Sequence, residues 1–505
     1  MTHLLLAVDQ GTTGSTVLVV RPDGGILGRG YEEHPQHFPQ PGWVEHDPLA
    51  IWATVQRATE QALAAAGVSA ASIGAVGITN QRETIVAWDA STSQPLGPTI
   101  VWQDRRTEAR CEALRSAGNA QRIRHITGLP VDPYFSASKI EWLMHHDQQV
   151  QRAAHDGTLR VGTIDTWLVW CMTGGASHIT DASNAARTML YDIHAEQWSA
   201  EQCELFGVDR SWLPDVVDSS GMLATCNPRA FCSIDAPICG IAGDQQSALF
   251  GQLCITPGRA KATYGTGAFV LVNSGSTVPT TEALISTVAW QRGGATTYAL
   301  EGSVFTAGAS VQWLRDGLQI IEHAPEIEAL ATSVPDSGGV MVVPAFAGLG
   351  APHWDANARG AMFGLTRGTT RAHIARATIE GTAFRVAELI DAMRAEGTSV
   401  TELRVDGGMA HNNLLLQMQA DVLGIPVTRP TSVETTSLGA AYLAALGSGM
   451  IGSMEDLSMA WTAERTFEPG AGATTLSTAY HRFQEAVRLT RALALAGNSQ
   501  EILLS

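Results

Sequence analysis

The chain has 505 residues, of which 45% are hydrophobic and 16% are charged, which predicts a globular protein of two or three domains. Its 49 acidic and 32 basic side chains give a net charge of −17, which argues against a basic surface for nucleic acid or anionic membranes. Its two lysines, Lys139 and Lys261, follow Ser138 and Ala260. A phosphate-binding P-loop requires glycine before its lysine, so the chain is not a P-loop nucleotidase.

The seven cysteines are dispersed and include no Cys-x-x-Cys pair, which favours reduced thiols over a zinc site or a disulfide framework. The first apolar run lacks a basic segment and ends at Asp9, so it does not look like a signal peptide. The stretch 61–79 is poor in charge, but it is too rich in Ala, Gly and Ser for a membrane span. We therefore expect a cytoplasmic protein with no nucleic-acid partner and no membrane insertion.

The chain opens with short strands. Residues 3–8 and 16–20 are apolar or β-branched and predict two strands, and a third begins near Ile26. The turn between the first two, residues 9–15, is rich in glycine and hydroxyl side chains. These patterns predict a β-meander whose first turn carries many small hydrogen-bond donors.

A helix and further strands follow the meander. Asp47 and Pro48 are typical of an N-cap and a first helical residue, and Gly67 is typical of a helix end. Further strands are expected at 74–79, 159–164 and 237–241. This mixture of a meander with β-α alternation predicts α/β domains.

The second half of the chain repeats the pattern of the first. Residues 262–272 read as strand, Gly-Thr-Gly turn and strand, and differ from the opening segment by one turn residue. The repeat predicts a duplicated fold with two domains, 1–252 and 253–505, and a cleft between them.

Three glycine-rich turns are candidates for binding phosphate or nucleoside. Backbone N–H groups of Gly-Thr turns can approach an anion closely, and threonine hydroxyls add further donors. The third turn, 406–408, follows a strand at 402–405 and precedes a helix starting near Asn412. Each turn alone is more typical of an ordinary hairpin, but the repetition in both halves favours a polyphosphate held from two sides.

Polar residues also follow several of the expected strands. Arg82 and Glu83 come after 74–79 and could bind neighbouring hydroxyl groups, although a surface ion pair is the alternative. Trp102 is either a core residue or an aromatic wall against a polyol. Asp244 follows 237–241 and is a candidate general base, with a helix cap as the alternative.

Two other patterns are set aside. The glycine spacing of 447–452 fits a dinucleotide-binding fingerprint but follows a predicted helix, so we expect a helix end and a loop. His34, His37 and His46 have no helical spacing, which favours surface histidines over a metal site.

Taken in chain order, the motifs resemble the FGGY carbohydrate kinases. The motifs that carry the resemblance are 11–13, 78–84, 101–104, 243–246, 264–267 and 406–408, with support from 38–45 and 467–470. Within that family, the segments around Arg82 and Trp102 resemble members that phosphorylate glycerol. The resemblance implies two actin-like (ribonuclease H-like) domains closing on glycerol and ATP-Mg2+, with sn-glycerol 3-phosphate and ADP as products. It also implies a homodimer or homotetramer.

The resemblance assigns expected roles to single residues, with Asp244 as the base. The expected glycerol-binding residues are Arg82, Glu83, Trp102, Tyr134, Asp244, Gln245 and Phe269. The expected nucleotide-binding residues are Thr12, Thr13, Gly14, Thr266, Gly308, Gln312, Gly408 and Asn412. Asp9 is the expected magnesium ligand.

The chain departs from the family pattern at three places. Gly14 stands where many members have serine. Thr16 stands where many members have arginine, which would remove a charge-assisted contact to the nucleotide phosphates. The segment 226–232 lacks the basic, glycine-rich character of members inhibited by fructose 1,6-bisphosphate, so we do not expect that regulation. The alternatives are a kinase for another small polyol, an actin-like or chaperone-like ATPase, and a non-catalytic regulator.

Overall fold

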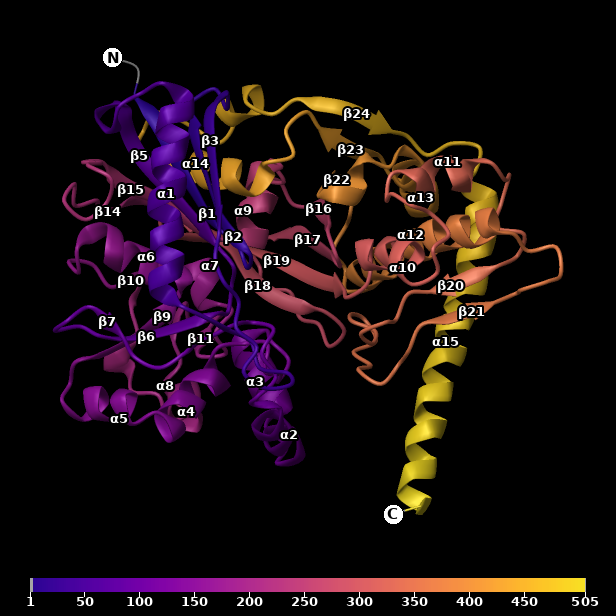
Figure 1. Ribbon diagram of the computed structural model, residues 1–505, viewed down its shortest axis with the longest axis horizontal. Coiled ribbons are helices and arrows are strands. Elements are labelled where there is room, and N and C mark those ends of the chain that lie inside the picture. The colour runs from indigo at the N-terminus through magenta and orange to yellow at the C-terminus, as the bar shows by residue number, and fades with distance from the viewer. Residues whose placement is uncertain (1–2, 505) are drawn as a thin grey trace.

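The computed structural model describes residues 3–504 and contains two large sheets (Figure 1). The first sheet has six strands in the order β14–β15–β5–β1–β2–β3. Their bounds are β1 (Leu4–Gln10), β2 (Gly14–Val20), β3 (Ile26–Glu33), β5 (Ile73–Asn80), β14 (Ser220–Thr225) and β15 (Pro237–Gly243). Along β1, Leu4 and Leu6 belong to one hydrophobic cluster and Leu5 and Ala7 to another, so both faces of this sheet are covered.

The second large sheet has seven strands in the order β18–β19–β17–β16–β22–β23–β24. Their bounds are β16 (Arg259–Tyr264), β17 (Ala268–Gly275), β18 (Ile285–Arg292), β19 (Ala295–Val304), β22 (Glu402–Asp406), β23 (Val427–Pro430) and β24 (Ala463–Phe467).

The two sheets share a pairing pattern. β1 and β2 are antiparallel, as are β2 and β3, whereas β1 pairs parallel with β5. In the same way β16–β17 and β17–β19 are antiparallel, and β16–β22 is parallel. The repetition expected from the two Gly-Thr turns is therefore present in the topology. It supports a boundary near residue 252, which stays a prediction.

The helices cover both sheets. They are α1 (Pro48–Ala66), α2 (Glu108–Ser116), α3 (Ala120–Thr127), α4 (Ala137–His146), α5 (Gln148–His155), α6 (Ile164–Thr173), α7 (Ala182–Ala185), α8 (Ala200–Leu205), α9 (Asp244–Gly251), α10 (Gly308–Asp316), α11 (Glu326–Thr332), α12 (Arg371–Ala395), α13 (Asn413–Leu423), α14 (Thr435–Gly447) and α15 (Ala473–Leu504). α1 packs on β1–β3, and α12 packs on β17 and β19. α15 extends away from the rest of the second half (Figure 1).

Helices α9 and α14 lie between the two large sheets. One hydrophobic cluster joins Leu5 of β1, Leu249 of α9, Leu443 of α14 and Leu271 of β17. α14 therefore comes from the second half of the sequence but packs against β1, β5 and β15 of the first sheet. The two halves are thus joined by a shared apolar layer.

A smaller sheet, with helices α2–α5 around it, is formed by a short strand that precedes β5 and by strands between β5 and β14. Its strands are β4 (Glu45–His46), β6 (Ile85–Asp89), β7 (Gln94–Pro95), β8 (Thr99–Ile100) and β9 (Leu159–Thr163). The core of this region includes Ile285 of β18 and Tyr298 of β19, so it also packs against the second half. Three two-stranded pairs complete the fold: β10 (Ile179–Asp181) with β13 (Asp215–Val217), β11 (Tyr191–Asp192) with β12 (Gln197–Trp198), and β20 (Met341–Val343) with β21 (Ala361–Phe363).

Local sequence signals placed α1 correctly. The side chain of Asp47 accepts a hydrogen bond from Leu49 N, Pro48 is the first helical residue, and Gly67 ends the helix with φ of 65°. The segment 447–452 is the end of α14 and the loop after it, as expected.

The prediction that His34 and His46 are surface histidines is wrong. Both are buried, and their ring centroids lie 4.7 Å apart. Burial lowers the pKa of His46 to about 3, and the neighbouring His34 acts in the same direction. His37 is exposed, as expected. His34 directly follows β3 and His46 lies in β4, and the local pattern did not reveal that these two segments meet.

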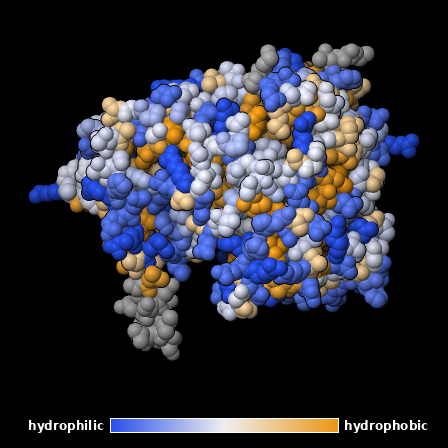
Figure 2. All heavy atoms as spheres, turned by 180° about the vertical axis from the view of Figure 1, so that it is seen from behind, coloured by the Kyte–Doolittle hydropathy of each residue, from blue (hydrophilic) through white to orange (hydrophobic). Residues whose placement is uncertain are grey.

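No helix in the described range 3–504 is both long and apolar enough to cross a membrane. On the face shown in Figure 2, hydrophobic side chains occur in several separate patches among hydrophilic ones.

Candidate functional site

Each of the two Gly-Thr turns is closed by a backbone hydrogen bond, and the second turn is one residue shorter. Gly11 N donates to Gly14 O at 2.9 Å, and Gly265 N donates to Gly267 O at 2.9 Å. A Cβ atom at Gly14 would lie 2.6 Å from the backbone oxygen of Glu32, so the turn has no room for a side chain there. The chain thus holds two comparable sets of small donors, one in each half.

The second turn lies beside two other segments of the expected nucleotide side. Gly308 N donates to Gly265 O at 2.9 Å, which joins the start of α10 to the turn that carries Thr266. A Cβ atom at Gly308 would lie 2.6 Å from Gly265 O and 3.6 Å from Met409 Sδ, so there is little space between them. Because Met409 follows Gly408, the fold brings Thr266, Gly308 and Gly408 together.

Two further expected nucleotide residues lie on the adjoining helices. Gln312 is exposed on α10, four residues after Gly308 and hence on the same side of that helix. Asn412 is the N-cap of α13, and its Oδ1 accepts from Leu415 N at 2.9 Å. Asn412 therefore has a structural role through its Oδ1, while its Nδ2 donors stay available for a ligand.

Arg82 lies just beyond β5 in a buried charge network. Its Nη1 and Nη2 donate to the two carboxylate oxygens of Glu301 in β19, at 2.6 and 2.9 Å. Arg187 donates from Nε to Glu83 at 2.6 Å and from Nη2 to Glu301 at 3.2 Å. All four side chains are at most 2% exposed, so the alternative of a surface ion pair is wrong.

The network balances two positive against two negative side chains. Burial alone would raise the pKa of Glu301, but Arg187 and Arg82 hold it at about 2. Glu83 has φ of 62°, a backbone conformation that non-glycine residues rarely adopt. A strained backbone conformation of this kind persists only where the surrounding contacts enforce it, and such residues are concentrated at functional sites. Arg82 and Glu83 are therefore held in place before any ligand arrives.

Asp244 lies next to this network, at the start of α9. Its Oδ1 is 3.3 Å from Arg82 Nε and accepts a hydrogen bond from Gln245 N at 2.7 Å. Gly243 is the N-cap residue of α9 and Asp244 is the first helical residue, so Asp244 is not the N-cap, although its carboxylate accepts from a first-turn N–H group. The side chain of Asp244 is 31% exposed, whereas those of Glu83 and Glu301 are 1% exposed.

Two aromatic rings border the same region. Tyr134 OH accepts from Arg82 Nη2 at 3.4 Å, and the ring centroids of Tyr134 and Trp102 lie 5.5 Å apart. Trp102 Nε1 donates to Thr12 Oγ1 at 2.9 Å. This tryptophan therefore connects the first Gly-Thr turn with the Arg82 network.

Phe269 approaches from the second half. It pairs with Ser303 in the β17–β19 register, while Leu271 pairs with Glu301. Side chains two residues apart on a strand share a face, so Phe269 lies on the same face as Glu301. Gln245 also connects the halves, because its Oε1 accepts a hydrogen bond from Lys261 of β16.

Asp9, the expected magnesium ligand, lies near the end of β1. Ser437 of α14 donates to its Oδ2 at 3.1 Å. Burial and the nearby charge of Asp244 raise the pKa of Asp9 to about 7. A pair of neighbouring carboxylates is a donor set that suits a hard divalent cation such as Mg2+. Thr16 lies directly opposite Asp9 in the β1–β2 register, so its side chain faces the same way.

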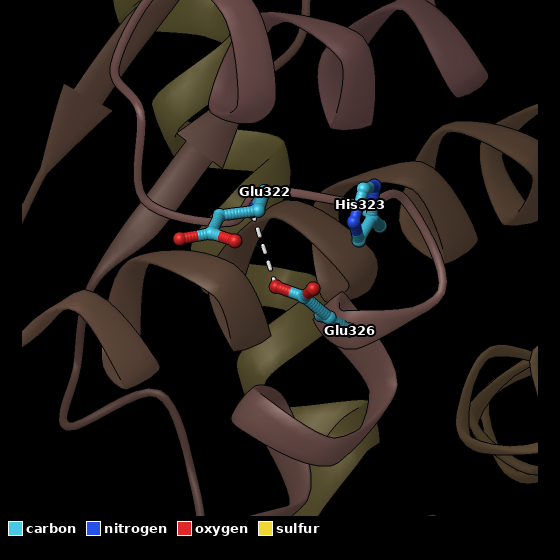
Figure 3. A group of neighbouring side chains, drawn as sticks. All are labelled: Glu322, His323 and Glu326. Atoms are coloured by element: carbon cyan, nitrogen blue, oxygen red, sulfur yellow. Dashed lines mark hydrogen bonds between the residues drawn. The ribbon is translucent and has the colours of Figure 1, made fainter.

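A second group of acidic and imidazole side chains lies elsewhere, at the surface before α11 (Figure 3). The candidate ligand atoms of Glu322, His323 and Glu326 lie within 4.8 Å of one another, and all three residues are exposed. Glu326 Oε2 accepts a hydrogen bond from Glu322 N at 3.1 Å. We assign no function to this group, because exposed acidic clusters are common without a metal.

Sequence reasoning missed part of the network. Arg187 and Glu301 gave no motif signal, and Gln246 lies in the motif 243–246 but was assigned no role; Glu301 is 219 residues from Arg82. Gln246 Oε1 accepts from Arg82 Nη1 at 3.1 Å. Lys261 could have been suspected, because it is one of only two lysines in the chain.

Comparison with known proteins gives the family. The N-terminal domain of the FGGY family of carbohydrate kinases matches residues 4–251, and its C-terminal domain matches residues 260–448. A protein of Aromatoleum aromaticum named glycerol kinase is 54% identical over 489 residues, covering 96% of this chain and 98% of that protein.

Solved structures agree. The crystal structure of Plasmodium falciparum glycerol kinase with ADP has a TM-score of 0.91 and 34% identity, covering 97% of this chain and 98% of that one. A ligand-bound xylulose kinase from Lactobacillus acidophilus has a TM-score of 0.87 and 20% identity, covering 96% and 98% of the two chains, and shows the shared fold. The predicted α/β fold with two actin-like domains is confirmed. With both family domains matched in order along the chain, this protein belongs to the FGGY family of carbohydrate kinases.

Proposed function

We propose that the protein transfers the γ-phosphoryl group of ATP to glycerol, giving sn-glycerol 3-phosphate and ADP, as the first step of glycerol catabolism. The main support is that relatives named glycerol kinase are 50% to 54% identical over nearly the whole chain. A solved relative of the same name was crystallised with ADP, which supports ATP as the phosphoryl donor.

The geometry offers donors and acceptors suited to a small polyol. Arg82 and Gln245 supply N–H donors, and Glu83 supplies carboxylate acceptors. Trp102 and Tyr134 form an aromatic edge beside them, with ring centroids 5.5 Å apart. We propose that these residues, together with Asp244 and with Phe269 from the other half, bind the glycerol hydroxyl groups and its C–H face.

Asp244 is the proposed general base. As the terminal hydroxyl oxygen attacks the γ-phosphorus, its proton moves to a carboxylate oxygen of Asp244 and the bond to the ADP oxygen breaks. Arg82 Nε, 3.3 Å from Asp244 Oδ1, orients the carboxylate. Thr12, Thr13 and Gly14 on one side, and Thr266 on the other, would donate to the phosphate oxygens.

Magnesium would be held by Asp9, directly or through water. When bound, it supplies positive charge against the β- and γ-phosphates. On the nucleoside side we propose Gly308, Gln312, Gly408 and the Nδ2 group of Asn412.

The function is tested by measuring ADP release with and without glycerol. Turnover that requires glycerol supports the proposal, whereas equal turnover without any polyol would identify an actin-like ATPase. A panel of small polyols tests substrate choice. If kcat/KM were higher for a tetritol than for glycerol, the tetritol would be the preferred substrate. A protein that binds ATP and glycerol but releases no ADP would be a regulator.

Asp244→Asn tests the base directly. The amide keeps the size of the side chain but does not accept the proton, so we expect kcat to fall at least about 100-fold. Affinity for ADP, measured by calorimetry, stays within about 2-fold because the nucleotide residues are untouched. Asp235→Asn, at an exposed carboxylate, is the control. Unchanged turnover in Asp244→Asn would remove Asp244 as base.

We also propose a cytoplasmic location, where ATP is available and the seven free cysteines stay reduced. A homodimer or homotetramer is proposed from the family resemblance alone. Light scattering at micromolar concentration tests the assembly.

A further inference from the structure

We infer that Lys261 is a positioning residue that fixes the side-chain amide of Gln245, so that Gln245 presents N–H donors, and not its oxygen, to the polyol. This inference rests on the proposed function for its substrate. It concerns a contact between the two halves of the chain.

Lys261 is buried completely in β16, on the face of the second sheet that meets α9. Its Nζ donates to Gln245 Oε1, and it donates to Thr263 Oγ1 at 3.0 Å. The chain has 32 basic residues in Lys and Arg together, and only Lys139 and Lys261 are lysines. Both lysines are buried. Each thus places a compact ammonium group, rather than the larger guanidinium group of arginine, inside the fold.

Burial and nearby carboxylates act on the pKa of Lys261 in opposite directions, and the net effect is a lowered pKa. Burial lowers the pKa of its amine, whereas the carboxylates of Asp406 and Asp244 act in the opposite direction. An ammonium group has three donors and no acceptor. Its partner on Gln245 must therefore be the amide oxygen, since the NH2 end of the amide also carries only donors.

The consequence concerns the other end of the amide. Among the residues that the structure describes, none accepts a recorded hydrogen bond from Gln245 Nε2, and the residue is half-buried next to Asp244. Two N–H donors are thus available to a hydroxyl oxygen. Without Lys261 the amide could rotate by 180° and present its oxygen instead. Lys261 thereby selects for a substrate atom that accepts a hydrogen bond at this point.

A double-mutant cycle in the full-length protein tests the inference. In steady-state assays with glycerol and ATP, we expect Lys261→Met to raise KM for glycerol about 10-fold and to leave KM for ATP within about 2-fold. In a Gln245→Ala background the same change should raise KM for glycerol by no more than about 2-fold, because its effect passes through Gln245. Equal effects in both backgrounds would overturn the inference, as would a loss of kcat with KM unchanged.

Lys139→Met is the matched control. Lys139 is equally buried, but it donates to the backbone oxygens of Tyr134 and Phe135. Its effect on KM should therefore be the same with Gln245 or Ala at position 245. If Lys139→Met were coupled to Gln245→Ala as strongly as Lys261→Met is, the cycle would be reporting general destabilisation. That result would count against the inference.

Two readouts remain if Lys261→Met does not fold or if glycerol is not the substrate. Gln245→Glu keeps Lys261 and gives it an ionic partner but removes the N–H donors, so it should fold and raise KM for glycerol; an unchanged KM contradicts the inference. The second readout is the midpoint of urea unfolding, which needs no substrate.

We expect Gln245→Ala to lower this midpoint less in a Lys261→Gln background than in the parent protein. Equal shifts in the two backgrounds would refute the contact between Lys261 and Gln245. Absence of glycerol-dependent ADP release by the parent protein would reject only the proposed function.

Discussion

At the scale of single residues, the site depends on how charges are paired. The carboxylates of Glu83 and Glu301 are buried against two arginines, whereas Asp9 and Asp244 lie near enough to each other that the charge of Asp244 raises the pKa of Asp9. The first pair holds the two arginines in place. The second pair includes the proposed base, Asp244, and the proposed magnesium ligand, Asp9.

The raised pKa of Asp9 predicts pH-dependent magnesium affinity. Because its pKa is raised to about 7 from 3.8, the group is mostly protonated below pH 7 and charged above it. A divalent cation binds the charged form, so the Mg2+ concentration for half-maximal activity should fall as the pH rises from 6 to 8. Mg2+ titrations of ADP release at each pH measure this. Asp9→Asn is the control and should lack the shift; a flat profile in the parent protein contradicts the prediction.

Glu301 should control substrate affinity without touching substrate. Glu301→Gln removes the charge that holds both terminal nitrogens of Arg82, so KM for glycerol should rise at least about 10-fold, with KM for ATP nearly unchanged. The buried arginines lose a partner, so the free energy of unfolding should fall by about 3–5 kcal/mol. Steady-state kinetics and urea unfolding measure the two effects.

The control for Glu301→Gln is Glu112→Gln. Glu112 pairs with Arg115 at the surface, with its side chain 64% exposed, and such pairs contribute little. If both variants behaved alike, Glu301 would have no special role in positioning Arg82.

At the scale of elements, α9 and α14 pack closely enough that glycine is required. A Cβ atom at Gly439 would lie 1.9 Å from Ser247 O, and one at Gly251 would lie 2.0 Å from Thr435 O. The side chain of Ser247 also donates to Thr436 O at 2.7 Å. This close packing joins the helix that carries Asp244 to the helix that carries Ser437, the partner of Asp9.

Gly439→Ala should therefore disturb both stability and activity. The added methyl group forces α9 and α14 apart, which should lower the free energy of unfolding by about 1–3 kcal/mol and reduce kcat/KM. Chemical unfolding and ADP release measure the two quantities. Gly368→Ala is the control, because a Cβ there meets nothing closer than 3.8 Å and φ is not positive. Equal stability of the two variants would contradict close packing at Gly439.

At the scale of the whole molecule, polar contacts join the two halves through their centre. Arg82 binds Glu301, Ser437 binds Asp9, and Gln252 of the first half donates to Asp406 at 3.0 Å. The apolar layer around α9 and α14 adds to these contacts. The halves therefore share a core, although their sheets are separate.

We expect one cooperative thermal transition. If the halves unfolded separately, α14 would lose the first sheet against which it packs, and the Arg82–Glu301 pair would break. Differential scanning calorimetry should give a calorimetric enthalpy close to the van't Hoff enthalpy. Two resolved transitions would contradict this prediction, and Glu301→Gln should broaden or split the single one.

The sequence alone determined the local features. The N-cap at Asp47, the helix end at Gly67 and the strand before Arg82 follow from rules that act within a few residues. The repeated Gly-Thr turns indicated the duplication, because each lies in a similar local pattern of strands. The site residues came from these turns and strand ends, together with the family resemblance.

Only the tertiary structure decided which distant residues meet. In the sequence, Glu301 is a single acidic residue in an ordinary strand. It lies 219 residues from Arg82, and the two pair only because the two large sheets approach each other in space. The burial of His34 and the packing of α14 on the first sheet are decided in the same way. Local propensity acts through neighbours along the chain, whereas burial and ion pairing depend on neighbours in space, so these features had no signal in the sequence.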